Sequence, residues 1–83
     1  MELVFSKKAL NDLRKLDQSI RRRVVEKLEF YSQHAHPTKF AEPLRDPYAG
    51  QYRFRIGDWR VFVRATGDKI FVLKVGHRRE VYR

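Results

Sequence analysis

The sequence predicts an α+β fold in which two helices cover one face of a mostly antiparallel sheet. Apolar residues recur at intervals of three and four through the first half of the chain, a spacing typical of amphipathic helices. From residue 51 onward, apolar and polar residues alternate, as they do in half-buried strands. The chain has 83 residues, which suffice for one hydrophobic core but not for two. We therefore expect a single domain over residues 1–83.

The first predicted elements are a short strand and two helices. Residues 2–5 suit a strand that joins the sheet, and Ser6 can cap the next helix because its hydroxyl accepts a backbone N–H of the first turn. Asp17 can cap a second, longer helix, and the short connection predicts an antiparallel helical hairpin. Each helix carries one apolar stripe. The stripes are Ala9, Leu10, Leu13 and Leu16, then Ile20, Val24, Leu28 and Tyr31.

Prolines end the helical part of the chain. Pro37 disfavours a helical conformation at the residue before it, so the second helix ends near His36. Pro43 and Pro47 follow within a few residues and are typical of irregular structure. We expect no regular element between the second helix and residue 51.

Three strands of a meander follow from residue 51. Gly57 and Asp58 form a tight turn that places Arg55 directly opposite Arg60. We expect a three-residue turn over 66–68 before the last strand at 70–75, because a two-residue turn would point Lys74 into the core. The predicted pairs are Val63 with Phe71, Val61 with Leu73 and Arg60 with Lys74, which place Phe71, Leu73 and Val75 on the core side.

This register gathers cationic side chains on the sheet face opposite the helices, with no acidic residue among them. Like charges placed opposite each other destabilise a sheet, so stability alone does not favour the arrangement. Arginine offers a rigid fork of N–H donors that fits phosphate oxygens. We therefore predict a site for a phosphodiester backbone, with a plain solvated face as the alternative. The residues are Arg53, Arg55, Arg60, Lys74 and Arg78.

The overall charge also indicates a polyanionic partner. The chain has 19 Lys and Arg against 10 Asp and Glu, which gives a formal net charge of +9 at pH 7. A small domain with this excess favours nucleic acid as its partner. Residues 43–83 hold 10 of the cations and 4 of the acids, so most of the excess lies in the predicted sheet.

Several other kinds of site are excluded or not expected. The chain has no cysteine, which excludes disulfides, thiol nucleophiles and zinc sites with cysteine ligands. His34 and His36 stand two residues apart without a third ligand nearby, so we expect no metal and no other cofactor. We see no signal peptide and no apolar run of ~18 residues, and we expect a cytoplasmic protein that does not bind membranes.

Two motifs in the second half carry a family resemblance. The first is Tyr-Arg-Phe-Arg-Ile-Gly-Asp-Trp-Arg over residues 52–60, and the second is Val-Gly-His-Arg over 75–78, with Val-Tyr at 81–82. Together they resemble the RelE group of the RelE/ParE toxin superfamily, ribosome-dependent mRNA interferases of toxin–antitoxin pairs. The likeness covers nearly the whole chain. It implies an endoribonuclease that cuts mRNA in the ribosomal A site without a metal, when the message's own 2′-hydroxyl attacks the adjacent phosphate.

The resemblance also implies residue roles. Arg60 falls where relatives have a phosphate-binding arginine, and Arg78 where they have a transition-state arginine. Tyr82 falls where a tyrosine stacks on or orients the cleaved nucleotide. Arg53 and Arg55 occupy positions of basic strand residues, where relatives have lysines. Arginine stays protonated at any physiological pH and is a poor general base, which argues against a lysine-type acid–base role here.

Histidine is the remaining candidate for proton transfer near neutral pH. An unperturbed histidine titrates near ~6.5, and His77 lies within the second motif. Strand alternation points His77 toward the core side, unless the strand ends or bulges at Gly76. Arg21 and Arg22 belong to a separate basic run on the second helix. They form either a solvated helix face or contacts with phosphates of 16S ribosomal RNA.

The expected partners are a cognate antitoxin and the ribosome with its mRNA. The antitoxin is expected to contribute an acidic or amphipathic segment that covers or distorts the basic face. Two other functions remain open. One is a ParE-like toxin that poisons DNA gyrase, and the other is an RNA- or ribosome-binding relative without catalysis.

Overall fold

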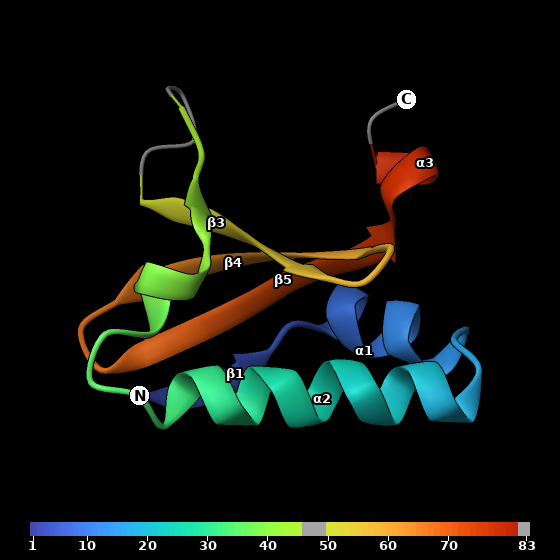
Figure 1. Cartoon of the computed structure of the whole chain (residues 1–83), viewed down its shortest axis with the longest axis horizontal. Helices are drawn as coiled ribbons and strands as arrows, with labels where there is room; N and C mark the ends of the chain where they lie inside the picture. Colours follow the sequence, from blue (N-terminus) through green and yellow to red (C-terminus); the bar gives the residue numbers. More distant parts are fainter. Residues whose placement is uncertain (46–49, 82–83) are drawn as a thin grey trace.

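The computed structural model describes residues 1–45 and 50–81 and has a central sheet with helices α1 and α2 on one side (Figure 1). The short strand β2 and the last helix, α3, rise on the other side. The α+β class and the placement of both helices on one face are confirmed. The elements are β1 (Glu2–Phe5), α1 (Lys7–Arg14), α2 (Gln18–Ser32), the 3-10 helix η1 (Pro37–Phe40), β2 (Glu42–Pro43), β3 (Gln51–Ile56), β4 (Trp59–Thr66), β5 (Lys69–His77) and α3 (Arg78–Val81).

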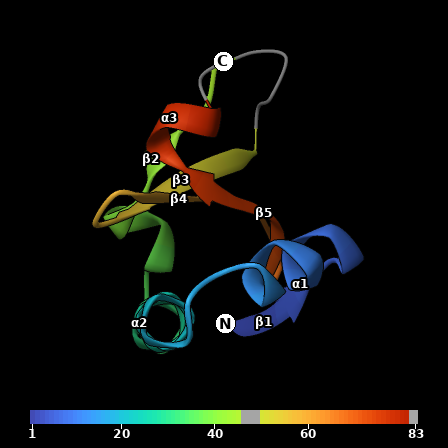
Figure 2. The same ribbon diagram turned by 90° about the vertical axis from the view of Figure 1, so that its right-hand side faces the viewer.

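The strands form one mixed sheet in the order β1-β5-β4-β3-β2. β1 joins β5 in parallel, and the other neighbouring pairs are antiparallel. The predicted N-terminal strand and three-strand meander are therefore confirmed. Viewed after a quarter turn, α2 is seen end-on below the sheet while α1 lies beside β5 (Figure 2).

The N-terminal helices begin where the sequence predicts. The Ser6 hydroxyl accepts the Ala9 N–H at 3.0 Å, which caps α1, and it donates to the Leu73 carbonyl at 3.0 Å. One side chain therefore fixes both the start of α1 and its position on β5. α2 begins after Asp17, although the Asp17 side chain makes no capping bond. Leu10 is 43% exposed, so the prediction that it belongs to the apolar stripe facing the core was wrong.

The core lies between the helices and the sheet. Val24 and Leu28 of α2 are buried against the strands, and Tyr31 stacks on Phe54 with ring centroids 4.9 Å apart. Burial of large apolar side chains is the main stabilising contribution to such a small fold. The buried apolar residues are Ala9, Leu13, Val24, Leu28, Phe54, Ile56, Val61, Val63, Ile70, Val72 and Val75.

The turn between β3 and β4 has the predicted form. Arg55 pairs with Arg60 across a two-residue turn of Gly57 and Asp58. Gly57 has a φ of 61°, a left-handed conformation that costs glycine little and side-chain-bearing residues more. The prediction that Arg55 and Arg60 stand opposite each other on one face of the sheet is therefore confirmed.

The predicted register of the last strand was wrong. Thr66 pairs with Lys69 across a two-residue turn, and a bulge then shifts the ladder so that Phe62 pairs with Lys74. Ile70 and Val72 consequently fill the core, in place of the predicted Phe71 and Leu73. The bulge reverses the alternation of β5, so that Val75 is still buried and Lys74 avoids the core. The predicted register was wrong because it requires an uninterrupted ladder between β4 and β5, and the bulge interrupts that ladder.

The stretch after α2 also contains more structure than expected. Pro43 pairs with Tyr52 and Glu42 with Arg53, so residues 42–43 form an edge strand. An edge position tolerates proline because no N–H is needed on the solvent side. Among the described residues, no helix has both the length and the apolar character to cross a membrane.

Candidate functional site

Arg60 is a buried cation on the sheet face opposite α1 and α2. Only 8% of the residue is exposed. Its Nη1 donates to the carbonyls of Gly57 at 2.9 Å and Trp59 at 3.0 Å. Within the described part of the chain, its Nε has no hydrogen-bond partner and no carboxylate forms an ion pair with it. Because guanidinium stays charged, burying it without a counter-ion is costly, and such a group is typical of an anion site.

Arg53 and Arg55 share one carboxylate. Glu42 Oε2 lies 2.6 Å from Arg53 Nη2, and Oε1 lies 2.8 Å from Arg55 Nε. The expectation that no acid stands among the cations was therefore wrong. Sequence alternation could not place Glu42 there, because its position depends on β2 pairing with β3 across the intervening loop.

These cations change the titration of Glu42. The hydrogen bond from Arg53 lowers the pKa of the carboxyl below its ordinary value of 4.5, and loss of solvent around it acts in the opposite direction. The charges of Arg55, Arg53 and Arg60 lower the pKa further. Arg60 therefore lies near enough to interact electrostatically with the Glu42 carboxylate, although the two form no ion pair.

Arg78 is held at the same turn as Arg60. Strand β5 ends at His77, and Arg78 begins α3 instead of continuing the strand as predicted. Its backbone N–H donates to the Asp58 carbonyl at 2.8 Å, and its Nε lies 3.6 Å from Asp58 Oδ1. Since Arg60 donates to Gly57, the two arginines are anchored on adjacent residues of one turn.

Sequence reasoning missed a third arginine at this turn. A Cβ added at Gly57 would lie 3.3 Å from Nη1 of Arg23, so the Arg23 side chain of α2 reaches the β3–β4 turn. The only sequence signal was the basic run on α2, because the contact depends on how α2 crosses the sheet. Arg23, Arg60 and Arg78 thus surround Gly57 and Asp58.

His77 lies on the opposite face of the sheet from Arg60. It pairs with Trp59, and the two rings meet edge to face with centroids 5.3 Å apart. Its Nδ1 accepts the Arg79 N–H at 3.2 Å. Because alternate strand residues point to opposite faces, His77 and Trp59 lie on the core side while Arg60 points away from it. The predicted direction of His77 is confirmed.

The remaining predicted site residues lie apart from the turn of Gly57 and Asp58, which Arg23, Arg60 and Arg78 surround. Lys74 Nζ stands 5.6 Å from the ring centroid of Phe62, the neighbour of Arg60 on the same face of β4. Arg21 and Arg22 belong to α2, in the helical layer. Tyr82 lies outside the described residues.

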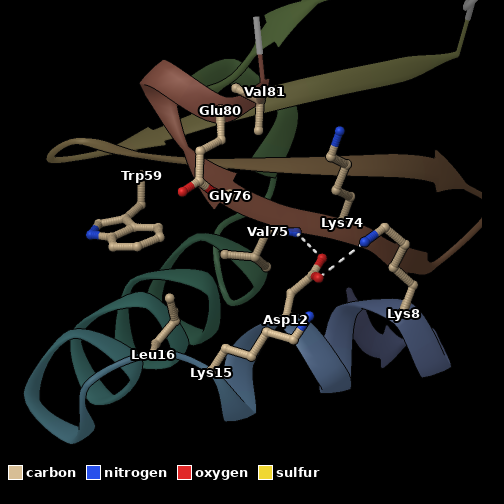
Figure 3. Close-up of a pocket in the computed structure, with 10 residues that line it drawn as sticks. All are labelled: Lys8, Asp12, Lys15, Leu16, Trp59, Lys74, Val75, Gly76, Glu80 and Val81. Carbon is tan, nitrogen blue, oxygen red and sulfur yellow. Dashed lines mark hydrogen bonds and ion pairs between the residues drawn. The ribbon is translucent and has the colours of Figure 1, made fainter. Parts of the chain in front are cut away.

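A cavity of about 400 Å³ lies between α1, β5 and α3 (Figure 3). Trp59 forms one wall, and Asp12 lies at the base of the cavity. Asp12 Oδ2 accepts the Val75 N–H at 3.0 Å, beyond the point where β1 stops pairing with β5. Lys8 Nζ binds the other carboxylate oxygen at 3.0 Å. Asp12 therefore takes the place of a strand partner at the open edge of β5.

The described residues contain no group of three or more His, Cys, Asp and Glu side chains that could hold a metal ion. The arginine cluster can nevertheless bind an oxyanion. The Arg60 guanidinium is held by two backbone carbonyls, so it can keep its position while negative charge develops on a bound phosphate.

Comparisons with known proteins agree with this fold. A family model described as the ParE toxin of the type II toxin–antitoxin system parDE matches residues 3–82. Toxin RelG of Mycobacterium tuberculosis is 33% identical over 81 residues, covering 95% of this chain and 92% of RelG.

Solved structures of toxin–antitoxin systems share the fold. The toxin–antitoxin complex RelBE2 from M. tuberculosis contains a chain with a TM-score of 0.80 and 31% identity, covering 95% of this chain and 92% of that one. A chain from the chromosomal ParDE system of P. aeruginosa has a TM-score of 0.73 and 18% identity, covering 93% and 95%. This protein therefore belongs to the RelE/ParE family of toxins from toxin–antitoxin systems.

Proposed function

We propose that this protein is a RelE-type endoribonuclease that cuts mRNA in the ribosomal A site and thereby inhibits translation. The buried Arg60 guanidinium supports this proposal most directly, because it is costly to bury and has no ion-pair partner among the described residues. Arg55 stands opposite Arg60, and Arg78 is anchored on the adjacent residue of the same turn. A phosphate bound there would supply the missing counter-ion.

The proposed reaction needs positive charge more than a nucleophile from the protein. The 2′-oxygen of RNA bonds to the adjacent phosphorus and loses its proton. The bond to the 5′-oxygen breaks, and that oxygen gains a proton, which leaves a 2′,3′-cyclic phosphate and a 5′-hydroxyl. Negative charge on the nonbridging oxygens would be stabilised by Arg60 and Arg78. Tyr82 is proposed to orient the cleaved nucleotide.

Other residues have supporting roles in the proposal. Arg53, Arg55 and Lys74 would bind neighbouring phosphates, and His77 is the candidate for proton transfer near neutral pH. Because the His77 ring packs on Trp59, proton transfer requires it to turn away from that contact. Arg21 and Arg22, on the helical layer, would contact ribosomal RNA in the cytoplasm.

A cleavage assay on programmed ribosomes with an empty A site tests the function. We expect Arg60→Ala and Arg78→Ala to lower the cleavage rate by about 10² to 10³, as loss of one preorganised donor does elsewhere. Arg64→Ala is the matched control, because Arg64 is an exposed cation on the same strand, about 13 Å from Arg60. Arg60→Lys keeps the buried charge and controls for folding. The proposal is contradicted if Arg60→Ala and Arg78→Ala are both folded and cleave mRNA as fast as wild type.

The second candidate is a ParE-like toxin that poisons DNA gyrase. It is favoured by the family model, which is that of the ParE toxin, and by the shared fold of the ParDE system. Expression would then induce DNA-damage signalling while transcripts stay intact. Transcript 5′ ends that are phased with codons distinguish the nuclease. Salt-sensitive RNA binding without cleavage on ribosomes would instead indicate a noncatalytic binding protein.

A further inference from the structure

Glu42 holds the two arginines of β3 in the way that a bound anion would. Its two oxygens are divided between two guanidinium groups, with Oε2 at 2.6 Å from Arg53 and Oε1 at 2.8 Å from Arg55. The arginines are two residues apart on one strand and so point to the same face. Two neighbouring oxygens of a phosphate can make the same pair of contacts, since guanidinium binds carboxylate and phosphate with similar geometry.

The ion pairs of Glu42 go to Arg53 and Arg55 and not to Arg60. Arg60 uses backbone carbonyls as acceptors. Glu42 pairs with Arg53 and Arg55, offsets one of their two positive charges, and forms no ion pair with Arg60 in the described part of the chain. An anion that approaches this face therefore meets one guanidinium in need of a counter-ion and two that are already occupied. The occupied pair lies next to the first, because Arg55 is paired with Arg60.

The contact is also one that a ligand can displace. The Glu42 side chain is 44% exposed, and its partners Arg55 and Arg53 are 61% and 19% exposed. The pair with Arg55 is thus open to solvent, and exposed ion pairs contribute little to stability. Strand β2 has only two residues and is an edge strand, so its carboxylate can swing away without disturbing the buried core. By contrast, the Arg60 contacts involve backbone atoms of a tight turn and cannot be exchanged so easily.

We propose that Glu42 is a built-in competitor for RNA phosphate. Its carboxylate occupies an anion subsite on Arg53 and Arg55, and a phosphate of the RNA takes that subsite when the phosphate next to it binds Arg60. The inference rests on the proposed function, because it takes RNA as the ligand of this face. Glu42 lowers the affinity for RNA, so that a phosphodiester chain held in place by other contacts is favoured over free RNA.

Binding of a single-stranded RNA that cannot be cleaved, with a 2′-O-methyl group on every sugar, measures the competition without catalysis. Glu42→Gln keeps the shape of the side chain and removes its charge. We expect this variant to bind about three- to tenfold more tightly, the equivalent of releasing one or two exposed ion pairs. The slope of log K against log salt should steepen by about 0.7, the value for one further phosphate of a single strand.

Glu29→Gln is the matched control. It removes the same charge from an exposed residue of α2, on the other side of the sheet, and we expect less than a twofold change. If Glu42 merely positions the arginines, Glu42→Gln will bind RNA more weakly than wild type. Equal tightening in both variants shows a net-charge effect. Either result overturns the inference.

A second measurement uses the wild-type protein and so does not depend on the folding of a variant. Titration of the Glu42 carboxyl by NMR, with and without the same RNA, reports whether its arginine partners are lost. We expect RNA to raise the pKa of Glu42, because displacement removes the guanidinium groups that lower it. An unchanged pKa at saturating RNA contradicts displacement. If wild type cleaves mRNA on ribosomes yet neither result appears, this inference fails while the proposed function stands.

Discussion

Individual arginines on the sheet differ in how their charge is balanced. Arg53 and Arg55 share the single negative charge of Glu42, whereas Arg60 is surrounded by protein and bonded to neutral carbonyls. The local dielectric around a buried charge is low, which strengthens its attraction for an anion. The same residue type on one face therefore provides both a pair that shares a carboxylate and a buried cation without one among the described residues.

The ion pairs of Glu42 predict an acid-sensitive contribution to stability. The pKa of Glu42 is lowered in the folded protein, so this contribution is complete above the ordinary value of 4.5 and is lost as the pH falls through the lowered pKa. We expect wild type to melt at a higher temperature than Glu42→Gln near pH 7. The difference should close as the pH falls below 4.5.

Thermal unfolding followed by circular dichroism across this pH range is the measurement. Glu29→Gln controls for the loss of one surface carboxylate from the helical layer. A melting difference between wild type and Glu42→Gln that persists unchanged in acid would show that the ion pairs are not its source.

At the scale of elements, the end of β5 controls where Arg78 lies. The bulge reverses the alternation of β5, the strand stops at His77, and α3 folds back over it. Gly76 permits this close return, because an added Cβ would lie 2.5 Å from Cγ1 of Val81. Arg78 is the first residue of α3, so the packing of α3 on Gly76 determines the position of its guanidinium.

Gly76→Ala should therefore displace α3 and lower cleavage without unfolding the protein. The added methyl group overpacks the contact with Val81, and such strain costs about 1–3 kcal/mol in the free energy of unfolding. Misplacement of a charge-stabilising group by about 1 Å can cost roughly 10² in rate. Ribosomal cleavage and urea unfolding measure the two effects.

The double variant Gly76→Ala/Val81→Ala is the control, because it removes the side-chain branches that the new methyl group would meet. We expect it to recover part of the lost rate. No recovery, with both variants folded, would locate the defect elsewhere than in the α3 contact.

The whole molecule is polarised. Helices α1 and α2 bury the core on one side of the sheet, and β2 and α3 lie on the other (Figure 1). The side chains of Arg53, Arg55 and Arg60 also belong to the face opposite α1 and α2. A net charge of +9 on a chain of 83 residues gives this surface a strong attraction for polyanions at low salt. Such a surface binds nucleic acid nonspecifically unless a partner neutralises it.

We predict that a cognate antitoxin supplies an acidic or amphipathic segment that covers or distorts the basic face. Co-expression with the neighbouring small reading frame should relieve toxicity and allow the two products to be copurified. The purified complex should bind the noncleavable RNA less tightly than the free toxin. Failure of the products to copurify, with toxicity unrelieved, would count against this partner.

Local patterns determined much of this protein without tertiary information. Ser6 predicts the start of α1, and Gly57 with Asp58 predicts the turn that sets Arg55 against Arg60. Each depends on atoms only a few residues apart, which is why the sequence sufficed. The likeness in two short motifs also predicted the family.

Only the tertiary structure decided which of the cations are buried and which are paired with a carboxylate. The bulge in β5 turns Val75 toward the core and Lys74 away from it. It depends on how β5 pairs with β4, so simple alternation along the sequence does not predict it. Glu42 reaches Arg53 and Arg55 because a loop brings an edge strand alongside β3. The sequence by itself determined that positive charge gathers on one sheet face. Packing between distant segments decided which of those charges is neutralised, because long-range contacts depend on the whole chain closing around one core.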